Sequence, residues 1–299
     1  MKSKRGKSGM LPIGLCAQLA CIWETTARKP GNVHRFRDFE DLSYTDFLLS
    51  AAAIAPVLEN ARHKPVGETV LGGVRATRQV VQTNTNLGIL LLLAPLAAVP
   101  LEEKLPQALE RILTNLTTND SRLVYEAIGL ATPGGMGLVS EQDIKDEPTQ
   151  PLRSIMGLAR DRDLIARQYV NGFQEVFQNG VSALKDGLQK TQSLEGAVIY
   201  GHLKLLADFP DSLIARKRGI QEAGQAARRA QQTLDSGWPR HQTGWEALAE
   251  LDGWLRAEGH NRNPGTTADL VAASLFVALR EGTIEIPLRY PWFAGFNHG

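Results

Sequence analysis

Residues 83–100 read TNTNLGILLLLAPLAAVP and place four small polar residues directly before an unbroken apolar run from Leu87 to Val99. A helix over 86–98 would be apolar on every face, so it belongs in the interior of a bundle. The run contains Pro95 and is shorter than the roughly 20 residues that a membrane-spanning helix needs. The stretch therefore predicts a buried central helix in a protein that is not embedded in a membrane.

The segments on both sides of this run also repeat their apolar residues at the helical period, and clusters of Pro, Gly, Asn and Asp separate them. Strand-like alternation is confined to TIEIPLRY at 283–290. No period of roughly 30 to 50 residues recurs, which argues against a solenoid. The prediction is an all-α fold, a single globular multi-helix bundle around the buried central helix. The expected helices are 10–27, 44–63, 67–82, 86–98, 103–114, 120–131, 159–189, 194–207, 213–234, 241–257 and 266–281.

The composition is that of an ordinary globular protein. The 299 residues carry a formal net charge of +1, with 43% hydrophobic and 22% charged residues. This balance gives no reason to expect nucleic-acid or membrane binding, so small-molecule chemistry is favoured. The two cysteines, Cys16 and Cys21, share one apolar segment and suit neither a disulfide framework nor a zinc site. A reduced, cytoplasmic protein is the prediction.

Two segments fall largely outside the expected helices. Residues 1–9 are basic and are predicted to form a flexible tail. Residues 132–158 are rich in Gly, Pro and acidic residues and are predicted to form a loop, either a functional lid or a disordered segment. We expect the remainder, 10–299, to be a single all-α catalytic domain that contains this loop.

The four polar residues before the apolar run are of the types that cap helix N-termini. They are Thr83, Asn84, Thr85 and Asn86, and one such residue is enough for a cap. Four in a row supply further hydrogen-bonding groups beside the positive end of the helix dipole, where phosphates bind. The cluster therefore indicates an anion site, with a redundant cap as the alternative.

A second stretch, ETTARKPGNVHRF at 24–36, joins a carboxylate to cationic groups. Glu24 is expected near the end of the first helix, and Lys29 and Gly31 flank the proline of a sharp Pro-Gly turn. The turn would present acidic and basic side chains together at a helix end. An exposed basic turn is the alternative.

A third stretch, DSLIARKRG at 211–219, offers Asp211 together with Arg216 and Lys217, a set able to serve a metal or a triphosphate. Its LIAR tetrapeptide also occurs at 164–167, each time with an acidic residue just upstream. Two helix first turns explain that repeat, because an acidic residue is favourable near a helix N-terminus. A solvated helix face is the alternative for the basic residues.

A fourth stretch, NPGTTADLVAAS at 263–274, opens a helix with Pro-Gly and Thr-Thr and places Asp269 in its first turn.

The histidines lack metal-ligand spacing, so no zinc site is expected. Trp238, Trp245 and Trp254 approximate helical spacing and are expected in the core rather than on a base-stacking surface.

Five blocks taken together resemble, in order, the triphosphoribosyl-dephospho-CoA synthase family. The resemblance runs from about Glu24 to about Val277, and five collinear blocks are far more specific than any one of them. It implies an all-α fold and a reaction in which ATP donates its triphosphoribosyl group to the ribose 2′-hydroxyl of 3′-dephospho-CoA, with adenine leaving. The blocks are KPGNVHR, TNTNLGILLLLAPLA, YEAIGLATPGGMG, PDSLIARKRG and NPGTTADLVAASLFV.

The resemblance also implies roles for residues in the matching blocks. Such a transfer needs negative charge near an oxocarbenium-like carbon, a base for the acceptor hydroxyl, and Mg²⁺ with cations for the triphosphate. Glu24, Asp211 and Asp269 are the implied catalytic carboxylates, and the latter two are also the implied Mg²⁺ ligands. The partners would be small-molecule nucleotides, and a homodimer is left open. The implied phosphate-binding residues are Lys29, Gly31, Asn84, Asn86, Gly88, Arg216 and Lys217.

One block departs from the family pattern. The family has Asn-Thr-His-Lys-Gly where this chain has Asn-Thr-Asn-Leu-Gly at 84–88, so the imidazole and the cation are both absent. Losing a lysine beside a triphosphate removes a charge-assisted contact worth about 1.5–3 kcal/mol. The departure resembles a divergent branch linked to methanopterin-dependent one-carbon metabolism, in which donor and acceptor can differ. The alternatives are therefore a hydrolase of an N-glycosidic bond and a non-catalytic nucleotide-binding or assembly protein.

Overall fold

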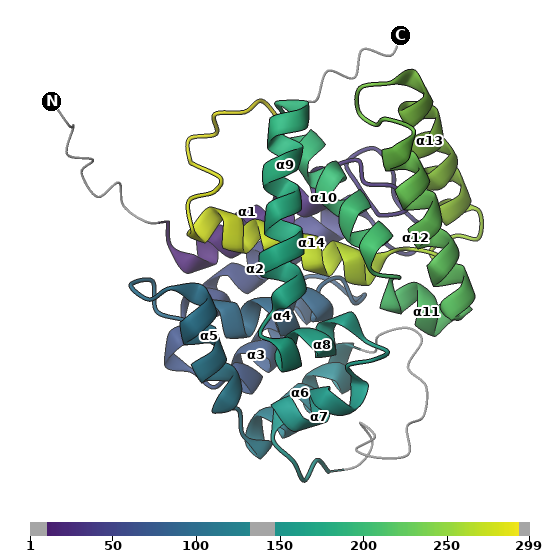
Figure 1. The fold of residues 1–299 in the computed structure, drawn as a ribbon. Coiled ribbons are helices and arrows are strands. Elements are labelled where there is room, and N and C mark those ends of the chain that lie inside the picture. The colour runs from purple at the N-terminus through teal and green to yellow at the C-terminus, as the bar shows by residue number, and fades with distance from the viewer. Residues whose placement is uncertain (1–10, 132–146, 293–299) are drawn as a thin grey trace, which may run out of the picture.

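The computed structural model of the chain describes residues 11–131 and 147–292. Within these residues it is all α, as predicted, and its extended pairings are isolated bridges between His34 and Arg37 and between Phe39 and Leu42 (Figure 1). The stretch 283–290 forms no strand. The helices are α1 Ile13–Thr26, α2 Tyr44–Glu59, α3 Val66–Arg78, α4 Leu87–Ala97, α5 Leu105–Thr114, α6 Thr118–Ala131, α7 Leu152–Ala159, α8 Leu164–Asn171, α9 Val181–Thr191, α10 Leu194–Asp208, α11 Ser212–Arg218, α12 Ile220–Asp235, α13 Gln242–Arg256 and α14 Gly265–Arg280, with a 3-10 turn η1 at Ala61–His63 and a π-helical segment η2 at Glu175–Gly180.

The predicted loop at 132–158 is wrong over its last part, because 152–158 belong to α7. Pro151 precedes the first turn, where its missing N–H removes no helical hydrogen bond. Leu152 and Ile155 are three residues apart and both are buried, so they anchor one face of this short helix. Residues 132–146 of the predicted loop, like the predicted tail at 1–9, lie outside the described residues.

Two predicted long helices are each divided. The segment 159–189 breaks at Gly172 and Phe173, whose φ angles are 70° and 63°, and the segment 213–234 breaks at Gly219, whose φ is 91°. A left-handed residue ends a helix without interrupting the apolar pattern around it. Periodicity alone therefore joined helices that the backbone separates.

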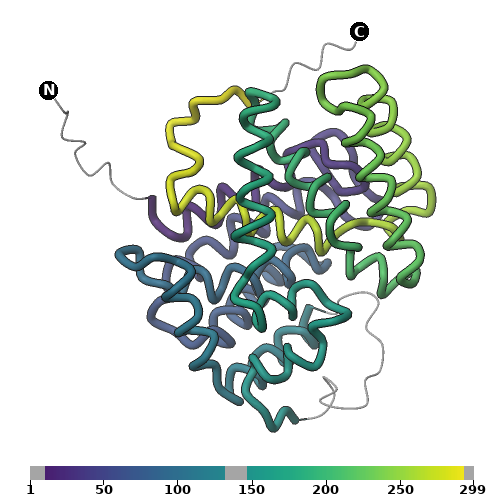
Figure 2. Tube along the Cα trace, viewed as in Figure 1, coloured from purple at the N-terminus to yellow at the C-terminus, as the bar shows by residue number. Residues whose placement is uncertain are grey.

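Three helices share the interior of the molecule. Ten of the eleven residues of α4 are buried, but α10 and α14 bury twelve residues each, so the interior is not organised around α4 alone. Helix α14 packs against both α4 and α1, and Figure 2 shows the purple trace of α1 beside the yellow trace of α14. Segments from opposite ends of the chain thus meet in the core.

The buried apolar residues form two clusters, and α10 contributes to both. The second cluster joins α10 to α11, α12 and α13, which lie together on one side of the molecule in Figure 1. Trp238 is buried in it, as predicted, whereas Trp245 and Trp254 are only partly buried and pack against it. The prediction of a single domain stays a prediction.

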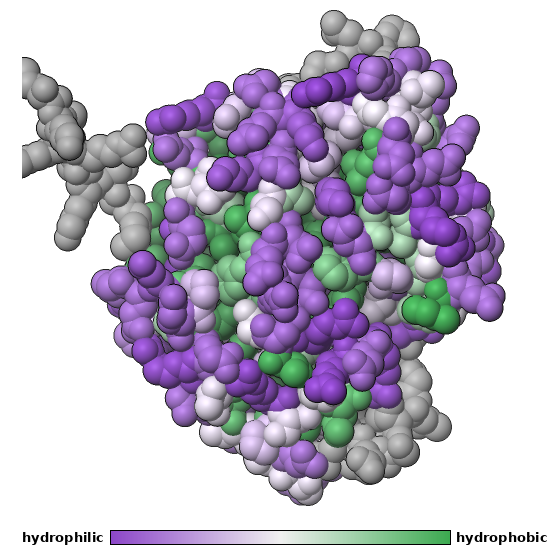
Figure 3. Space-filling model, in the orientation of Figure 1, coloured by the Kyte–Doolittle hydropathy of each residue, from purple (hydrophilic) through white to green (hydrophobic). Residues whose placement is uncertain are grey.

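The surface and the cysteines agree with the composition. The face in Figure 3 is mainly hydrophilic, with small apolar areas between polar side chains. Among the described helices, none combines the length and the hydrophobicity needed to traverse a bilayer. Cys16 and Cys21 are both buried and free, in line with the prediction that they form no disulfide.

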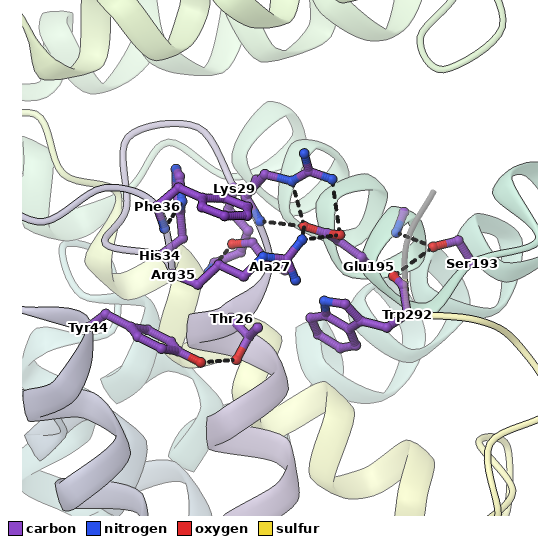
Figure 4. A network of polar contacts seen from close by, with 12 residues as sticks. Thr26, Ala27, Lys29, His34, Arg35, Phe36, Tyr44, Ser193, Glu195 and Trp292 are labelled. Carbon is purple, nitrogen blue, oxygen red and sulfur yellow. Dashed lines mark hydrogen bonds and ion pairs between the residues drawn. The ribbon is translucent and has the colours of Figure 1, made fainter. Parts of the chain in front are cut away.

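A buried carboxylate holds the segment that follows α1. Glu195, at the start of α10, is fully buried and accepts hydrogen bonds from Arg28 Nε at 2.8 Å and from Arg35 at 3.0 Å. Close to it, Ser193 Oγ donates to the carbonyl oxygen of Trp292 at 3.0 Å (Figure 4). This network fixes the path of residues 27–36 and so positions the side chains that this segment contributes to the site.

Candidate active site

A cavity of about 840 Å³ lies where several helices begin. Its lining includes residues of the first turns of α4, α8 and α14, and α11 adds two basic side chains. The positive ends of helix dipoles therefore surround the cavity, which favours negatively charged groups inside it.

The polar cluster at 83–86 lines the cavity at the start of α4. Asn84 Oδ1 accepts a hydrogen bond from Leu87 N at 3.1 Å and so caps the helix. Asn86 is buried and its Nδ2 donates to Thr77 Oγ1 at 2.9 Å, while Thr85 Oγ1 lies 2.5 Å from Ser50 Oγ. The cluster thus builds the mouth of α4, and the exposed Asn84 is its member most open to a ligand.

Asp269 and Gly88 meet at this mouth. A Cβ atom on Gly88 would lie 2.5 Å from Asp269 Cγ and 2.9 Å from Ile165 Cδ1, so only glycine allows the carboxyl group to sit against the first turn of α4. Burial, together with the nearby carboxylates of Glu24 and Asp211, raises the pKa of Asp269 well above its usual range. The structure therefore places a carboxyl group with strongly altered acidity inside the cavity.

Glu24 also lines the cavity, but Lys29 does not. Lys29 is fully buried, and its Nζ lies 2.9 Å from Glu24 Oε1 and also donates to the Glu24 carbonyl oxygen. Burial raises the pKa of Glu24, and the Lys29 charge partly offsets that rise. The lysine therefore helps to keep the Glu24 carboxylate ionised, and these contacts, away from the cavity lining, do not support its predicted part in phosphate binding.

Gly31 is likewise outside the cavity lining. Its φ of 77° requires glycine, and its N–H donates to Asp252 Oδ1 at 2.7 Å. Leu255 lies so close that a Cβ on Gly31 would clash with it. Gly31 serves the turn after α1, so the structure does not support its predicted contact with a nucleotide.

Asp211 is not a lining residue either, and its oxygens are fully used. Oδ1 accepts from Leu213 N at 2.8 Å and Ile214 N at 3.0 Å, and Oδ2 accepts from Thr267 N at 2.7 Å and Thr267 Oγ1 at 2.8 Å. These bonds cap α11 and tie it to the first turn of α14. The predicted roles of Asp211 as catalytic carboxylate and Mg²⁺ ligand are therefore replaced by a positioning role.

The basic side chains of α11 do line the cavity. Arg216 lies 3.5 Å from Asp163 Oδ2, and Lys217 Nζ donates to the His260 carbonyl oxygen at 3.3 Å. Burial lowers the pKa of Lys217. Asp163 caps α8 as Asp211 caps α11, which confirms that the two LIAR stretches are helix starts.

Part of the cavity wall is apolar. Leu87 occupies the tip of α4 and is itself buried, and the wall continues along α4, α6, α7 and α8. The sequence did not indicate this wall, because its residues follow the same apolar period as any core-facing helix. Its other members are Leu91, Val124, Ile128, Leu152, Ile155, Met156 and Ile165.

Other lining residues also escaped prediction. Thr25 and Asn32 stand beside predicted site residues in the sequence, and each has a buried side-chain oxygen without a hydrogen-bond partner among the described residues. Asp163 and Asn263 line the cavity at helix starts. In the sequence, the only indication for these two residues was that each precedes a helix. Many surface residues stand at the same position and do no more than cap a helix.

The fold and the cavity define an all-α protein with a ligand cavity that is lined by acidic, basic and apolar side chains. The chain belongs to the ATP:dephospho-CoA triphosphoribosyl transferase family, whose model matches residues 10–286. This match covers nearly the whole chain and confirms the resemblance of the five blocks.

Two relatives agree with this family. A crystal structure of an Archaeoglobus fulgidus protein assigned as a triphosphoribosyl-dephospho-CoA synthase is 30% identical, with a TM-score of 0.60, over 79% of this chain and 99% of that one. A curated protein of Pseudomonas savastanoi pv. phaseolicola, assigned as a 2-(5''-triphosphoribosyl)-3'-dephosphocoenzyme-A synthase, is 31% identical over 123 residues. That match spans 38% of this chain and 42% of the curated protein.

Proposed function

We propose that the chain transfers a triphosphoribosyl or related ribosyl group from ATP, or a similar nucleotide, to a ribose hydroxyl of dephospho-CoA or a related acceptor. The single observation that carries the proposal is the Asp269 carboxyl group at the mouth of α4, within a cavity that Glu24 and basic side chains also line. Family membership supports the same reaction class.

Two of the carboxylates that line the cavity, Glu24 and Asp269, have different roles in this proposal. In the transfer, the bond between C1′ and the base breaks, and the acceptor oxygen forms a new bond to C1′. Asp269 takes the proton of the acceptor hydroxyl, since a raised pKa makes its ionised form a stronger base. Glu24 supplies negative charge that stabilises the positive charge developing at C1′. Adenine leaves and takes up a proton.

The phosphate chain requires positive charge, which Arg216 and Lys217 provide from α11 and the start of α4 supplements. Mg²⁺ commonly binds through one or two protein carboxylates plus substrate phosphates, and among the predicted ligands only Asp269 reaches the cavity. Within the described residues, no group of three acidic, His or Cys side chains could hold a metal ion by itself. Mg²⁺ would therefore enter with the nucleotide, held chiefly by its phosphates, and would neutralise phosphate charge.

One observation favours a second candidate, a nucleotide-binding protein without turnover. Leu87 stands at the tip of α4 where the family pattern has a lysine, and it is buried against the cavity. A ligand there meets no cation from α4. Such a protein would bind a nucleotide but leave its glycosidic bond intact.

The test is incubation of the purified chain with ATP, Mg²⁺ and dephospho-CoA, followed by chromatography of free adenine and of the acceptor. We expect adenine and a ribosylated acceptor in equal amounts, and neither with Asp269→Asn. Adenine without a modified acceptor would indicate a hydrolase. Nucleotide binding without adenine release from any tested acceptor would contradict the transferase and support the binding protein.

A further inference from the structure

Two residues of the cavity lining each carry a buried side-chain oxygen that has no hydrogen-bond partner among the described residues. Thr25 is 2% exposed and Asn32 is 5% exposed, yet Thr25 Oγ1 and Asn32 Oδ1 make no hydrogen bond among the described residues. Both residues line the cavity that holds Glu24 and Asp269. A buried polar atom left without a partner is unfavourable by about 1–3 kcal/mol, so such atoms indicate a role in binding.

The orientation of the Asn32 amide follows from its neighbours. Nδ2 donates to Asn263 Oδ1 at 2.6 Å and lies 3.4 Å from the carbonyl oxygen of Pro264. Because a backbone carbonyl only accepts, the NH₂ group must face Pro264 and Oδ1 is the free atom. Arg256 also donates to the Asn32 backbone oxygen, so both ends of the residue are held. Asn32 therefore presents a fixed acceptor.

Thr25 offers a complementary group. It lies in the last turn of α1, directly after Glu24, and its hydroxyl can donate as well as accept. Glu24 and Asp269 also line the cavity, and their carboxyl groups accept hydrogen bonds when ionised. The cavity lining therefore offers several acceptors and suits a ligand group that carries O–H donors.

We propose that Thr25 and Asn32 bind the ribose hydroxyls of the nucleotide donor and make the site selective for a ribosyl over a deoxyribosyl group. The inference rests on the proposed function, which supplies a ribosyl donor. A ribose ring carries two adjacent hydroxyls, each of which can donate to Asn32 Oδ1 or exchange a hydrogen bond with Thr25. Neither residue takes part in the proton transfer, so both act in specificity.

The test is the affinity of the full chain for ATP, 2′-deoxy-ATP and 3′-deoxy-ATP with Mg²⁺, measured by calorimetry. The wild type should bind ATP about three to ten times more tightly than at least one deoxy analogue, the range expected for one neutral hydrogen bond. Thr25→Val and Asn32→Leu should each bring one of these ratios close to one, and Thr25→Ser should preserve it.

Thr25→Val has a matched control and a second readout. Thr233 is fully buried in α12, but its Oγ1 donates to Arg229 O at 3.0 Å and it lies outside the cavity, so Thr233→Val should leave all ratios unchanged. Because Thr25 Oγ1 has no partner to lose, Thr25→Val should keep or raise the melting temperature. A loss of selectivity without a loss of stability separates ligand binding from a structural role.

The outcomes are distinct. Unchanged ATP to deoxy-ATP ratios in both variants would overturn the inference and leave the proposed transfer intact. An altered preference for ATP over purine riboside triphosphate, with unchanged deoxy ratios, would also overturn it, because the subsite would then contact the base. Binding of ribose 5-phosphate but not ATP, weakened by Thr25→Val, would support the inference while contradicting ATP as donor. Binding of neither probe would overturn both.

Discussion

Replacing Gly88 by alanine tests whether the position of Asp269 matters. The new Cβ would overlap Asp269 Oδ2 and lie 2.5 Å from Asp269 Cγ, whereas ordinary contact begins at 3.4 Å, so the carboxyl group would have to retreat by at least about 0.9 Å. A displacement of about 1 Å in a catalytic group can lower the rate 10²-fold. Gly88→Ala should therefore reduce adenine release by about two orders of magnitude.

The same substitution should have a modest effect on stability. Overpacking typically destabilises by about 1–3 kcal/mol, and alanine in a helix offsets about 0.5–1 kcal/mol of that. Gly253→Ala in α13 is the matched control, because its Cβ meets nothing within 4 Å, and it should stabilise the fold without changing activity. Urea unfolding and adenine release should be measured on both variants. A folded Gly88→Ala protein with the wild-type rate would refute the importance of this contact.

Three further predictions concern charge. Asp269→Asn should abolish transfer but stabilise the fold at pH 7. Folding raises the pKa of the Asp269 carboxyl group, so this group destabilises the folded state increasingly as pH rises above its ordinary pKa near 4. Urea unfolding of the variant from pH 4 to 8 should therefore show a flatter pH dependence than the wild type, and lower stability than the wild type at pH 7 would contradict this. Leu87→Lys should tighten ATP binding by about one to two orders of magnitude, because it adds a charge-assisted contact to the phosphates, and Leu87→Met is the control. An unchanged affinity in the folded Leu87→Lys protein would show that the phosphates lie away from α4. Glu195→Ala should destabilise the fold by about 2–4 kcal/mol in urea unfolding, because it removes the buried ion pairs with Arg28 and Arg35. Wild-type stability of this variant would show that these ion pairs do not hold the segment after α1.

The sequence predicted the fold class because amphipathic periodicity extends over most of the chain. It also located the mouth of α4, since an apolar run after four polar residues has few other interpretations. It missed the breaks at Gly172 and Gly219, because one left-handed residue leaves the apolar pattern intact. It missed α7, because a glycine and flanking prolines resemble a loop.

The candidate site was only partly predictable. Asp269, Glu24, Arg216 and Lys217 do line one cavity, as their blocks indicated. Asp211 and Lys29 stand in equally suggestive blocks, but their charges are used inside the protein, by helix capping and by an ion pair. Residue type and spacing cannot distinguish these uses, because both require a buried charged group near a helix end.

The most direct test of the account is a crystal structure of the chain with bound ATP. We expect the ribose between Glu24 and Asp269 at the mouth of α4, with the phosphates directed towards Arg216 and Lys217. A nucleotide bound outside this cavity, or one whose ribose lies far from both carboxylates, would contradict the proposed site.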